Sequence, residues 1–385
     1  MRKLSQFSIS LSMLLVVCLA LFSLVACEGS DSEGLAAHEA TTQEAEAGTG
    51  TRIITDSVDR EIEIPEQVDS VIALGVGAPR IATYLDVVDM LIGAEEVDQE
   101  EVTVLRDYNP IHNELFKTLP TVGQGGGSGN NNAFPEEIIM LAPDVIIAGF
   151  DYEAAEELQA QTGIPVVSVR HSTGLASETF IRAVRVFAEI VGAEERGEEL
   201  LSTIASMKAD LEARTADVAD SDKLSVYAGA VTWNGRRGFG GTYAHFGPLD
   251  AINALNVADD SGLDGFFEAD FEKIVVWDPD VIFLDPGNMD LVNDEYRANP
   301  SYFNSLRAVQ EGRVYTMPAF NFSGTNITYA FINAYYAGTV LFPEEFADVD
   351  IETKAGEILT EFLGENTFEQ MREGGLFYGT IEIGQ

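Results

Sequence analysis

An internal repeat constrains the fold of this chain more than any other feature. Residues 136–146 read EEIIMLAPDVI, and residues 272–282 read EKIVVWDPDVI, at a constant offset of 136 positions. In each copy, helix-forming residues lead to a proline, which ends a helix, and then to β-branched residues, which favour a strand. The repeat therefore favours two halves with the same topology over chance recurrence of a common helix-to-strand motif.

Short β-rich runs alternate with helical runs from residue 51 onward, which is typical of parallel sheets covered by helices. The middle of the chain differs, because apolar residues recur at helical spacing over residues 180–191 and again from Leu200 to about residue 218. The second helix begins before Leu200, with Gly197 near its start, and is expected to have about 24 residues and a length of about 36 Å, enough to cross between domains. The sequence therefore predicts an α/β fold of two lobes with mainly parallel sheets, bridged by one long helix.

The first 27 residues have the pattern of a secretion signal. Arg2 and Lys3 precede an apolar run over residues 7–25, which ends in the sequence LVAC at residues 24–27. This ending resembles the lipobox of bacterial lipoproteins, in which the cysteine, here Cys27, is acylated and becomes the mature N-terminus. Residues 28–50 contain almost nothing apolar, which predicts a flexible tether. We therefore expect an exported protein that is lipid-anchored to the cell membrane and faces the periplasm or the cell exterior.

Acidic residues dominate the charge: 64 Asp and Glu stand against 22 Lys and Arg, a net charge of −42. Such a surface repels nucleic acid and anionic lipid, so the acyl chains are the expected attachment to the membrane and nucleic acid is no partner. A charge of this size also favours a surface adapted to high salt. Both cysteines, Cys18 and Cys27, lie in the signal segment, so we expect no disulfide or thiolate metal site in the folded part.

Several motifs after residue 51 carry a family resemblance. They are IITDS at 53–57 with REIEIP at 60–65, VIALG at 71–75, and the two PDVI units of the repeat. Together they resemble the substrate-binding proteins of ABC importers for iron chelates and cobalamin. The resemblance covers essentially everything from residue 51 onward and implies a ligand cleft between two lobes. The expected boundaries are residues 51–176 for the N-terminal lobe, 177–220 for the connecting helical segment and 221–385 for the C-terminal lobe.

Enzyme motifs find little support in the sequence. There is no G-x-S-x-G elbow around Ser128 and no phosphate-binding G-x-x-x-x-G-K-[ST] loop. The run that begins at Gly75 has Arg80 where a dinucleotide-binding fingerprint needs its third glycine. We therefore expect no catalytic activity and no intrinsic cofactor. A membrane-anchored hydrolase is the alternative from a different class.

Candidate ligand contacts in the first half lie in loops that follow strands. Pro79 begins a helix, so the free N–H groups there and the charge of Arg80 could hold a ligand carboxylate or catecholate. The glycine-rich segment 123–132, which includes Gln124, permits close approach of backbone to a ligand. A plain turn with a surface arginine and a solvent loop without a role are the alternatives. Tyr152 and His171 complete the candidates of this half.

The second half contains the richest group of candidates. Adjacent arginines at 236 and 237 are flanked by aromatic residues, and arginine forks bind carboxylates while aromatic rings pack on flat chelates or corrin edges. The alternative is an Asn-Gly hairpin tip with solvated arginines. The predicted ligand-binding residues are Arg80, Gln124, Tyr152, His171, Trp233, Arg236, Arg237, Tyr243 and His245.

Direct metal coordination is a second possibility within the binding proteins. Related importers for bare zinc or manganese use spaced histidines with a carboxylate, and His112, His171 and His245, with Asp285 as a conceivable fourth ligand, could form such a site. Histidines so far apart in sequence are more often structural or surface residues.

The resemblance also implies a partner. In the family, a glutamate on the outer surface of each lobe docks against arginines of the permease, and the matching positions are Glu136 and Glu272, which open the two repeats. The alternative is that both are ordinary acids in the first turn of a helix. We expect a monomeric solute-binding component of an ABC importer, which captures an iron–siderophore chelate or a corrinoid and delivers it to a permease dimer with its ATPase subunits.

Overall fold

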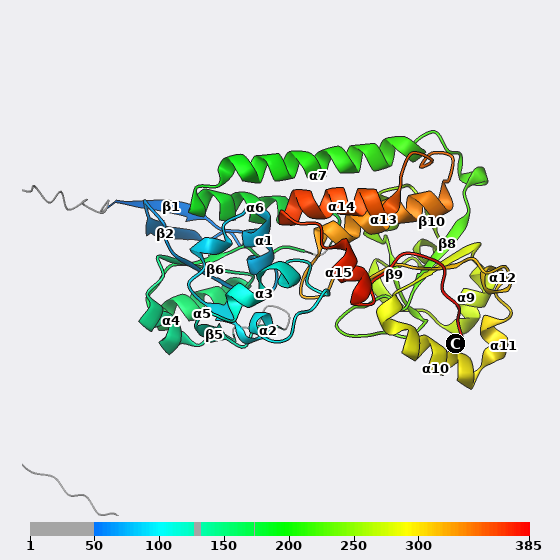
Figure 1. Ribbon diagram of the computed structural model, residues 1–385, viewed down its shortest axis with the longest axis horizontal. Coiled ribbons are helices and arrows are strands. Elements are labelled where there is room, and N and C mark those ends of the chain that lie inside the picture. The colour runs from blue at the N-terminus through cyan, green and yellow to red at the C-terminus, as the bar shows by residue number, and fades with distance from the viewer. Residues whose placement is uncertain (1–49, 127–131, 173) are drawn as a thin grey trace, which may run out of the picture. The chain divides into compact units, whose positions relative to one another are not determined.

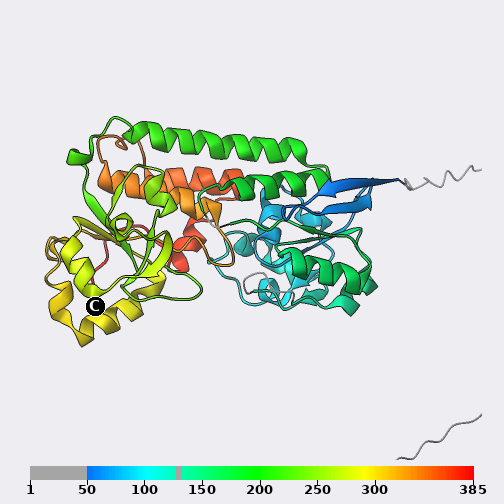
Figure 2. The ribbon, with the colours of Figure 1, turned by 180° about the vertical axis from the view of Figure 1, so that it is seen from behind.

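The structure, a computed structural model, describes residues 50–126, 132–172 and 174–385 (Figure 1 and Figure 2). The predicted signal segment, Cys27 and nearly all of the predicted tether lie outside the described residues. Among the residues that are described, no helix is both long enough and apolar enough to span a membrane.

A β-hairpin opens the described chain. Its antiparallel strands are β1 (Thr51–Thr55) and β2 (Glu61–Pro65). The buried carboxylate of Asp56 at the turn accepts hydrogen bonds from Arg60 Nε at 2.8 Å and from the backbone N–H of Ser168 at 3.1 Å. Because Ser168 ends a strand of the neighbouring sheet, these bonds fix the hairpin to that sheet.

Three parallel strands form the N-terminal sheet, in the order β3-β6-β7. They are β3 (Val71–Leu74), β6 (Val145–Ala148) and β7 (Val166–Ser168), and every residue in them is buried, which explains their continuous apolar runs. A parallel pair lies beside them, β4 (Ala94–Glu95) with β5 (Thr121–Gly123). The helices of this half are α1 (Ala78–Tyr84), η1 (Val88–Met90), α2 (Glu96–Gln99), α3 (Asn109–Phe116), α4 (Pro135–Leu141) and α5 (Tyr152–Thr162).

Four parallel strands form the C-terminal sheet, in the order β10-β8-β12-β13. They are β10 (Leu255–Asn256), β8 (Ser225–Gly229), β12 (Val281–Leu284) and β13 (Val314–Thr316). An antiparallel pair accompanies them, β9 (Gly241–Ala244) with β11 (Gly265–Glu268). The helices of this half before β13 are η2 (Asp220–Asp222), α8 (Gly247–Asp250), η3 (Val257–Ser261), α9 (Phe271–Trp277), η4 (Pro286–Asn288), α10 (Met289–Ala298), α11 (Pro300–Phe303) and α12 (Arg307–Gln310).

The two copies of the internal repeat form the same unit, a short helix followed by the central strand of a sheet. The first copy is α4 with β6, and the second is α9 with β12. In the first, Asp144 accepts hydrogen bonds from the backbone N–H and the hydroxyl of Ser70, at 2.9 and 3.0 Å. In the second, Asp280 accepts the same two bonds from Ser225, at 2.9 and 2.8 Å. The aspartate of each PDVI unit therefore joins its strand to the start of the neighbouring one, and the α/β fold with mainly parallel sheets is confirmed.

Two helices connect the halves in sequence. The side chain of Ser177 caps α6 (Glu178–Val191), which ends at Gly192 in the left-handed conformation and covers the helical spacing expected over residues 180–191. The long helix that follows is α7 (Glu194–Thr215), with 22 residues against about 24 expected. Near its start, Arg196 Nε donates to the carbonyl of Tyr84 at 3.1 Å, and at its end Thr215 Oγ1 accepts from Asn253 at 3.0 Å. The two ends of α7 therefore contact residues from the two halves of the sequence.

The last part of the chain forms three helices, which pack on a hydrophobic core that both sheets share. The helices are α13 (Ile327–Leu341), α14 (Ile351–Leu363) and α15 (Phe368–Glu373), and α13 packs against both α14 and α7 (Figure 1). One hydrophobic cluster includes Val71 of β3, Val226 of β8, Phe283 of β12 and Phe331 of α13. A shared, close-packed core opposes large movements of one sheet relative to the other.

Candidate ligand-binding site

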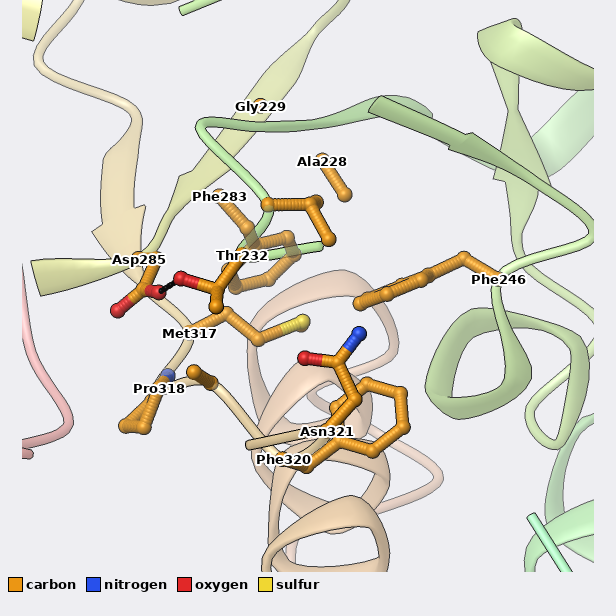
Figure 3. A pocket seen from close by; sticks show the side chains of 12 residues that line it. Ala228, Gly229, Thr232, Phe246, Phe283, Asp285, Met317, Pro318, Phe320 and Asn321 are labelled. Atoms are coloured by element: carbon orange, nitrogen blue, oxygen red, sulfur yellow. Dashed lines mark hydrogen bonds between the residues drawn. The ribbon is translucent and has the colours of Figure 1, made fainter. Parts of the chain in front are cut away.

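The carboxyl ends of the C-terminal strands lie level with one another. Gly229 of β8 pairs with Leu284 of β12, and Leu284 pairs with Thr316 of β13. In open α/β sheets, ligands bind beyond this edge, where the connecting loops emerge. The segments that follow these three strands line a narrow pocket here (Figure 3).

The narrow pocket is largely filled by side chains. Asp285 is buried in its wall and accepts hydrogen bonds from Thr232 Oγ1 at 2.6 Å and from the backbone N–H of Gly287 at 3.0 Å (Figure 3). Burial raises the pKa of Asp285 to about 6, and these hydrogen bonds oppose the shift. The rings of Phe246 and Phe320 lie 5.4 Å apart at one side. With a volume of about 10 Å³, the pocket holds about one water molecule and is too small for a chelate.

A wide cavity of about 720 Å³ adjoins the narrow pocket and shares Phe246, Phe320 and Asn321 with it. Its wall comes from residues 174–178, from one face of α7, and from β9, β11, α8 and loops of the C-terminal half. Its volume lies in the range of sites for small molecules and cofactors. Four aromatic side chains line it, namely Trp233, Tyr243, Phe246 and Phe320.

Aromatic packing holds the wall of the wide cavity in place. The indole of Trp233 stacks on Phe266, with ring centres 6.2 Å apart and planes 18° apart. Tyr243 meets the same indole edge-on at 5.6 Å, and its ring lies 6.0 Å from that of Phe246. Rings that are fixed in this way offer a preformed apolar surface, at little cost in side-chain entropy, to a flat or bulky ligand.

The same cavity is strongly acidic. Four carboxylates line it, from Glu178, Glu212, Asp250 and Asp264, against the single ammonium of Lys208. Desolvation and the nearby charge of Asp259 raise the pKa of Asp250 to about 6, which means that a further negative charge is unfavourable at this position. The field in the cavity therefore attracts cations and repels free oxyanions.

Three residues at the cavity could hold a metal ion. Ligand atoms of His245, Asp250 and Asp259 all lie within 4.8 Å of one another, and within the described ranges this is the one group of three or more histidine, cysteine or acidic side chains with that proximity. The backbone N–H of His245 donates to Asp259 Oδ1 at 2.7 Å. Imidazole nitrogen with carboxylate oxygen is a donor set that suits a divalent transition-metal ion.

Arg80 has a different position from the one predicted. It was expected to face a ligand, yet only 1% of its surface is exposed. Its Nε donates to Asp107 Oδ1 at 2.9 Å, and Nη2 donates to Asn326 Oδ1 at 2.8 Å. Nη1 donates to the carbonyl of Ser323 at 2.9 Å. These hydrogen bonds join α1 to the segment before α13. The guanidinium of Arg80 is used in contacts within the protein, and Arg80 lines neither the narrow pocket nor the wide cavity.

Neither of the two adjacent arginines lines the narrow pocket or the wide cavity. Arg236 forms an ion pair with Asp290 and donates to Asn288 Oδ1 at 3.1 Å. Arg237 donates to the carbonyl of Trp233 at 2.9 Å, and its guanidinium lies 5.1 Å from the centre of the Phe266 ring. Arg237 therefore packs against the aromatic wall, and the ligand-binding role of the two arginines stays a prediction. Three other predicted residues, Trp233, Tyr243 and His245, do line the wide cavity.

Predicted residues of the first half follow the carboxyl ends of its strands but lie outside both cavities. His171 comes after β7, half-buried, with Nδ1 3.2 Å from the carbonyl of Val169, and burial lowers its pKa to about 4, so the ring is neutral near pH 7. A Cβ added at Gly77, where φ is +91°, would lie 2.6 Å from Cε1 of His171. Only glycine therefore fits at position 77. Tyr152 after β6 and Gln124 after β5 are exposed, and most of the glycine-rich segment beyond residue 126 lies outside the described residues.

The three histidines of the alternative metal site do not meet. His112 lies beside Phe116 in a separate surface hollow with residues of α14, and burial lowers its pKa. His171 is next to Gly77, whereas His245 belongs to the cluster with two aspartates. Asp285, the conceivable fourth ligand, is hydrogen-bonded in the narrow pocket. The predicted site of His112, His171 and His245 is therefore wrong for this structure.

Other cavity residues were missed from the sequence. They are the acids Glu178, Glu212, Asp250 and Asp264, with Lys208, Phe320 and Asn321; Asp259, which lies beside Asp250, was missed as well. Phe320 and Asn321 follow β13, the last parallel strand of the C-terminal sheet, so the run of Met, Pro, Ala, Phe and Asn at 317–321 was a usable signal. The sequence could not single out the acids of the cavity, because the chain has 64 acidic residues and every segment contains several of them.

The fold and the cavity at the strand ends define a solute-binding protein of α/β type. Comparison with known families agrees: residues 81–319, more than half of the chain, match the family described as periplasmic binding protein. The chain belongs to that family, and it is a periplasmic binding protein of an ABC transporter. Proteins of this family are exported to the periplasm.

Individual relatives are distant. The molybdate-binding protein MolA of Haemophilus influenzae is 23% identical over 337 residues, which cover 81% of this chain and 90% of that protein. Its structure with bound molybdate matches with a TM-score of 0.61 at 20% identity, over 82% of this chain and 98% of the other. A periplasmic solute binding protein from Veillonella parvula reaches 0.64 at 18% identity, over 85% and 97%. CeuE of Helicobacter pylori with bound Ni(II) reaches 0.55 at 18% identity, over 81% and 95%. At these identities the structural likeness shows the fold.

Proposed function

We propose that this protein is the lipid-anchored, non-catalytic solute-binding component of an importer for a bulky metal chelate. The wide cavity with its aromatic wall and acidic lining is the observation that carries the proposal. An iron–siderophore chelate or a corrinoid without net negative charge matches that surface, because aromatic rings pack on the organic shell and the carboxylates attract positive charge.

The acidic lining also separates this chain from its molybdate-binding relative. A molybdate ion is a small dianion, and four carboxylates around one ammonium repel it. A cavity of about 720 Å³ is far larger than such an ion requires. Both the charge and the volume therefore favour a chelate over a free oxyanion.

A binding screen tests this proposal directly. Cyanocobalamin, ferric hydroxamate and catecholate siderophores, haem and molybdate are each titrated into the folded chain, with quenching of Trp233 fluorescence as the readout. Trp233→Phe, measured in parallel, separates the signal of the cavity from that of Trp277. We expect saturable quenching and co-elution of visible absorbance with one of the chelates. Tight binding of molybdate, with no chelate bound, would contradict the proposal.

The cluster of His245, Asp250 and Asp259 favours a second candidate function, the binding of a bare divalent cation at the edge of the same cavity. Titration with Mn²⁺, Ni²⁺ and Zn²⁺, followed by calorimetry, distinguishes the two candidates. A cation-importing protein binds one of these ions tightly with no chelator present, whereas a chelate-binding protein takes up the ion only in its complex.

The remaining parts of the proposal concern architecture and partners. We propose lobes at residues 51–176 and 221–385, with segment 177–220 and its helix α7 as the bridge and the ligand held in a cleft between the lobes. Residues 28–50 tether the monomer to a lipid on Cys27.

The acids Glu136 and Glu272, both exposed in the first turns of α4 and α9, dock against a permease dimer with its ATPase subunits.

A further inference from the structure

Two exposed apolar side chains occupy equivalent positions in the internal repeat. Met140 is 71% exposed and Val276 is 81% exposed, and they are separated by the repeat offset of 136 positions. Within the described residues, no other large apolar side chain is as exposed as either of them. The most exposed apolar residue of each half therefore lies at the same place in the fold.

The helices that carry them are matched along their whole length. Helix α4 spans Pro135–Leu141 and helix α9 spans Phe271–Trp277, so Met140 and Val276 are each the sixth residue. Ile138 and Ile274 are fully buried and fix both helices to the body in the same way. The equivalence of the two side chains follows from structure as well as from sequence.

Each apolar side chain shares a helix face with an acid. Glu136 precedes Met140 by four positions, and Glu272 precedes Val276 by four, a spacing that places the members of each pair next to each other on one face. Both acids are exposed, and among the described residues neither forms an ion pair. Each half thus presents the same small surface, one carboxylate beside one apolar side chain, which we name the acid–apolar face.

Local stability does not explain the apolar member of this face. Valine is β-branched and a poorer helix former than the glutamate that abounds in this chain, and at 81% exposure Val276 gains little from burial. The recurrence of an exposed apolar side chain at the same repeat position, on a chain with a net charge of −42, favours a contact surface common to both halves over chance exposure.

We propose that Met140 and Val276 are apolar anchor residues for the permease, one in each lobe, and that they supply binding energy next to the charge pairs of Glu136 and Glu272. The inference rests on the proposed transport function and extends it to the chemistry of the partner. Two equivalent faces on one chain fit a partner made of two identical subunits, each with a basic side chain beside an apolar hollow. A lipid surface is a poor occupant, because both faces carry an acid on a strongly acidic protein.

The test uses the full lipidated chain and its ABC permease–ATPase complex in liposomes. Met140→Ser combined with Val276→Ser should leave the unfolding midpoint and chelate affinity unchanged. The concentration of binding protein that half-maximally stimulates ATPase activity should rise about tenfold, and about threefold for each single variant, because buried apolar contacts act mainly on dissociation. The matched control is Ile53→Ser combined with Val102→Ser, which removes side chains that are 66% and 52% exposed outside the repeat and should change nothing.

The outcomes separate the two levels of the proposal. A double variant that stimulates ATPase activity at the wild-type concentration overturns the role of the acid–apolar faces and leaves the transport function standing. A wild-type chain that binds no chelate and stimulates no ATPase activity overturns the transport function, and the inference with it. Light scattering decides the occupant: a wild-type dimer that the double variant dissociates would identify a second copy of this chain as the partner and overturn the proposal.

Discussion

Arg80 and Asp107 form an ion pair of 2.9 Å inside the protein, and the side chain of Asn326 binds both residues. The carboxylate of Asp107 also accepts hydrogen bonds from the hydroxyls of Tyr84 and Thr328. The network thus joins α1, the start of α3 and the start of α13. A buried pair with this many partners holds the loop after β3 against the segment before α13.

Removal of one partner should therefore destabilise the fold. Arg80→Met leaves the Asp107 carboxylate buried without its counter-ion, and the free energy of unfolding should fall by about 3–5 kcal/mol. Urea unfolding followed by circular dichroism measures the change. The matched control is Arg185→Met, which breaks an exposed pair with Glu198 and should lower the free energy of unfolding far less. Equal effects of the two substitutions would show that the buried network contributes nothing special.

This network also explains what the sequence could and could not reveal about Arg80. The helix start at Pro79 was predictable, because it depends on local preferences of the chain. The partners of the side chain were not, since Asp107 is 27 positions away and Asn326 is 246 positions away. The same holds for Arg236. Its counter-ion Asp290 is 54 positions away in the sequence, so the arginine seemed to be unpaired and was predicted as a ligand contact.

The fold itself was largely predictable, for a physical reason. Its repeated unit consists of a helix, a turn and a buried strand that follow one another in the chain. The sequence repeat that begins at residues 136 and 272 predicts this unit in both halves. The wide cavity was predictable only in part. Trp233 follows β8, and Tyr243 and His245 lie in and just after β9. The acids on α6 and α7, in contrast, enter the wall through tertiary packing of those helices.

The aromatic wall gives the second prediction. Trp233→Ala removes a ring that lines the wide cavity and stacks on Phe266, and Tyr243→Ala removes its edge-on neighbour. Each substitution should weaken binding of the cognate chelate about tenfold, because an aromatic contact of this kind contributes about 1 kcal/mol beyond its buried area. Isothermal titration calorimetry measures the change in Kd. Arg236→Ala, which alters a side chain outside the cavity, should retain wild-type affinity, and a large loss there would restore the arginine as a ligand contact.

Binding of a divalent cation to His245, Asp250 and Asp259 should depend on pH. A metal ion needs the ionised carboxylate, and the pKa of Asp250 is raised to about 6 by desolvation and by the charge of Asp259. Because the pKa is raised, protonation competes in the range where an ordinary aspartate stays ionised. Affinity for Mn²⁺ should therefore be full at pH 7.5 and should fall steeply as the pH decreases through 6 to 5.

Two asparagine variants isolate the group responsible. Asp250→Asn should abolish Mn²⁺ binding at every pH. Asp264→Asn changes a carboxylate in the same cavity but outside the cluster, so it should keep the pH profile and weaken binding only slightly. Electron paramagnetic resonance of free Mn²⁺ reads the bound fraction directly. Identical profiles for Asp250→Asn and the wild type would exclude the cluster as the site.

Membrane attachment tests the prediction for the first segment of the chain. Cys27→Ala should leave the folded part intact and release the protein from membranes, because the acyl chains provide the attachment. Fractionation of expressing cells, with immunoblotting of the soluble and membrane fractions, measures the release. A variant that stays with the membranes through a high-salt wash would refute the lipobox assignment.

The acids of the repeat give the last prediction. Glu136→Ala combined with Glu272→Ala should preserve the fold and chelate affinity, since both side chains are exposed and lie in helices outside the wide cavity. The charge pairs with permease arginines would be lost, and charge complementarity acts mainly on encounter rate and register. Uptake of the radiolabelled chelate should fall at least tenfold at low ionic strength and less at high salt, where screening already weakens the wild type. Glu137→Ala combined with Lys273→Ala, the next pair along the repeat, is the matched control and should transport normally. Normal uptake by the first double variant would mean that docking uses another part of the acidic surface.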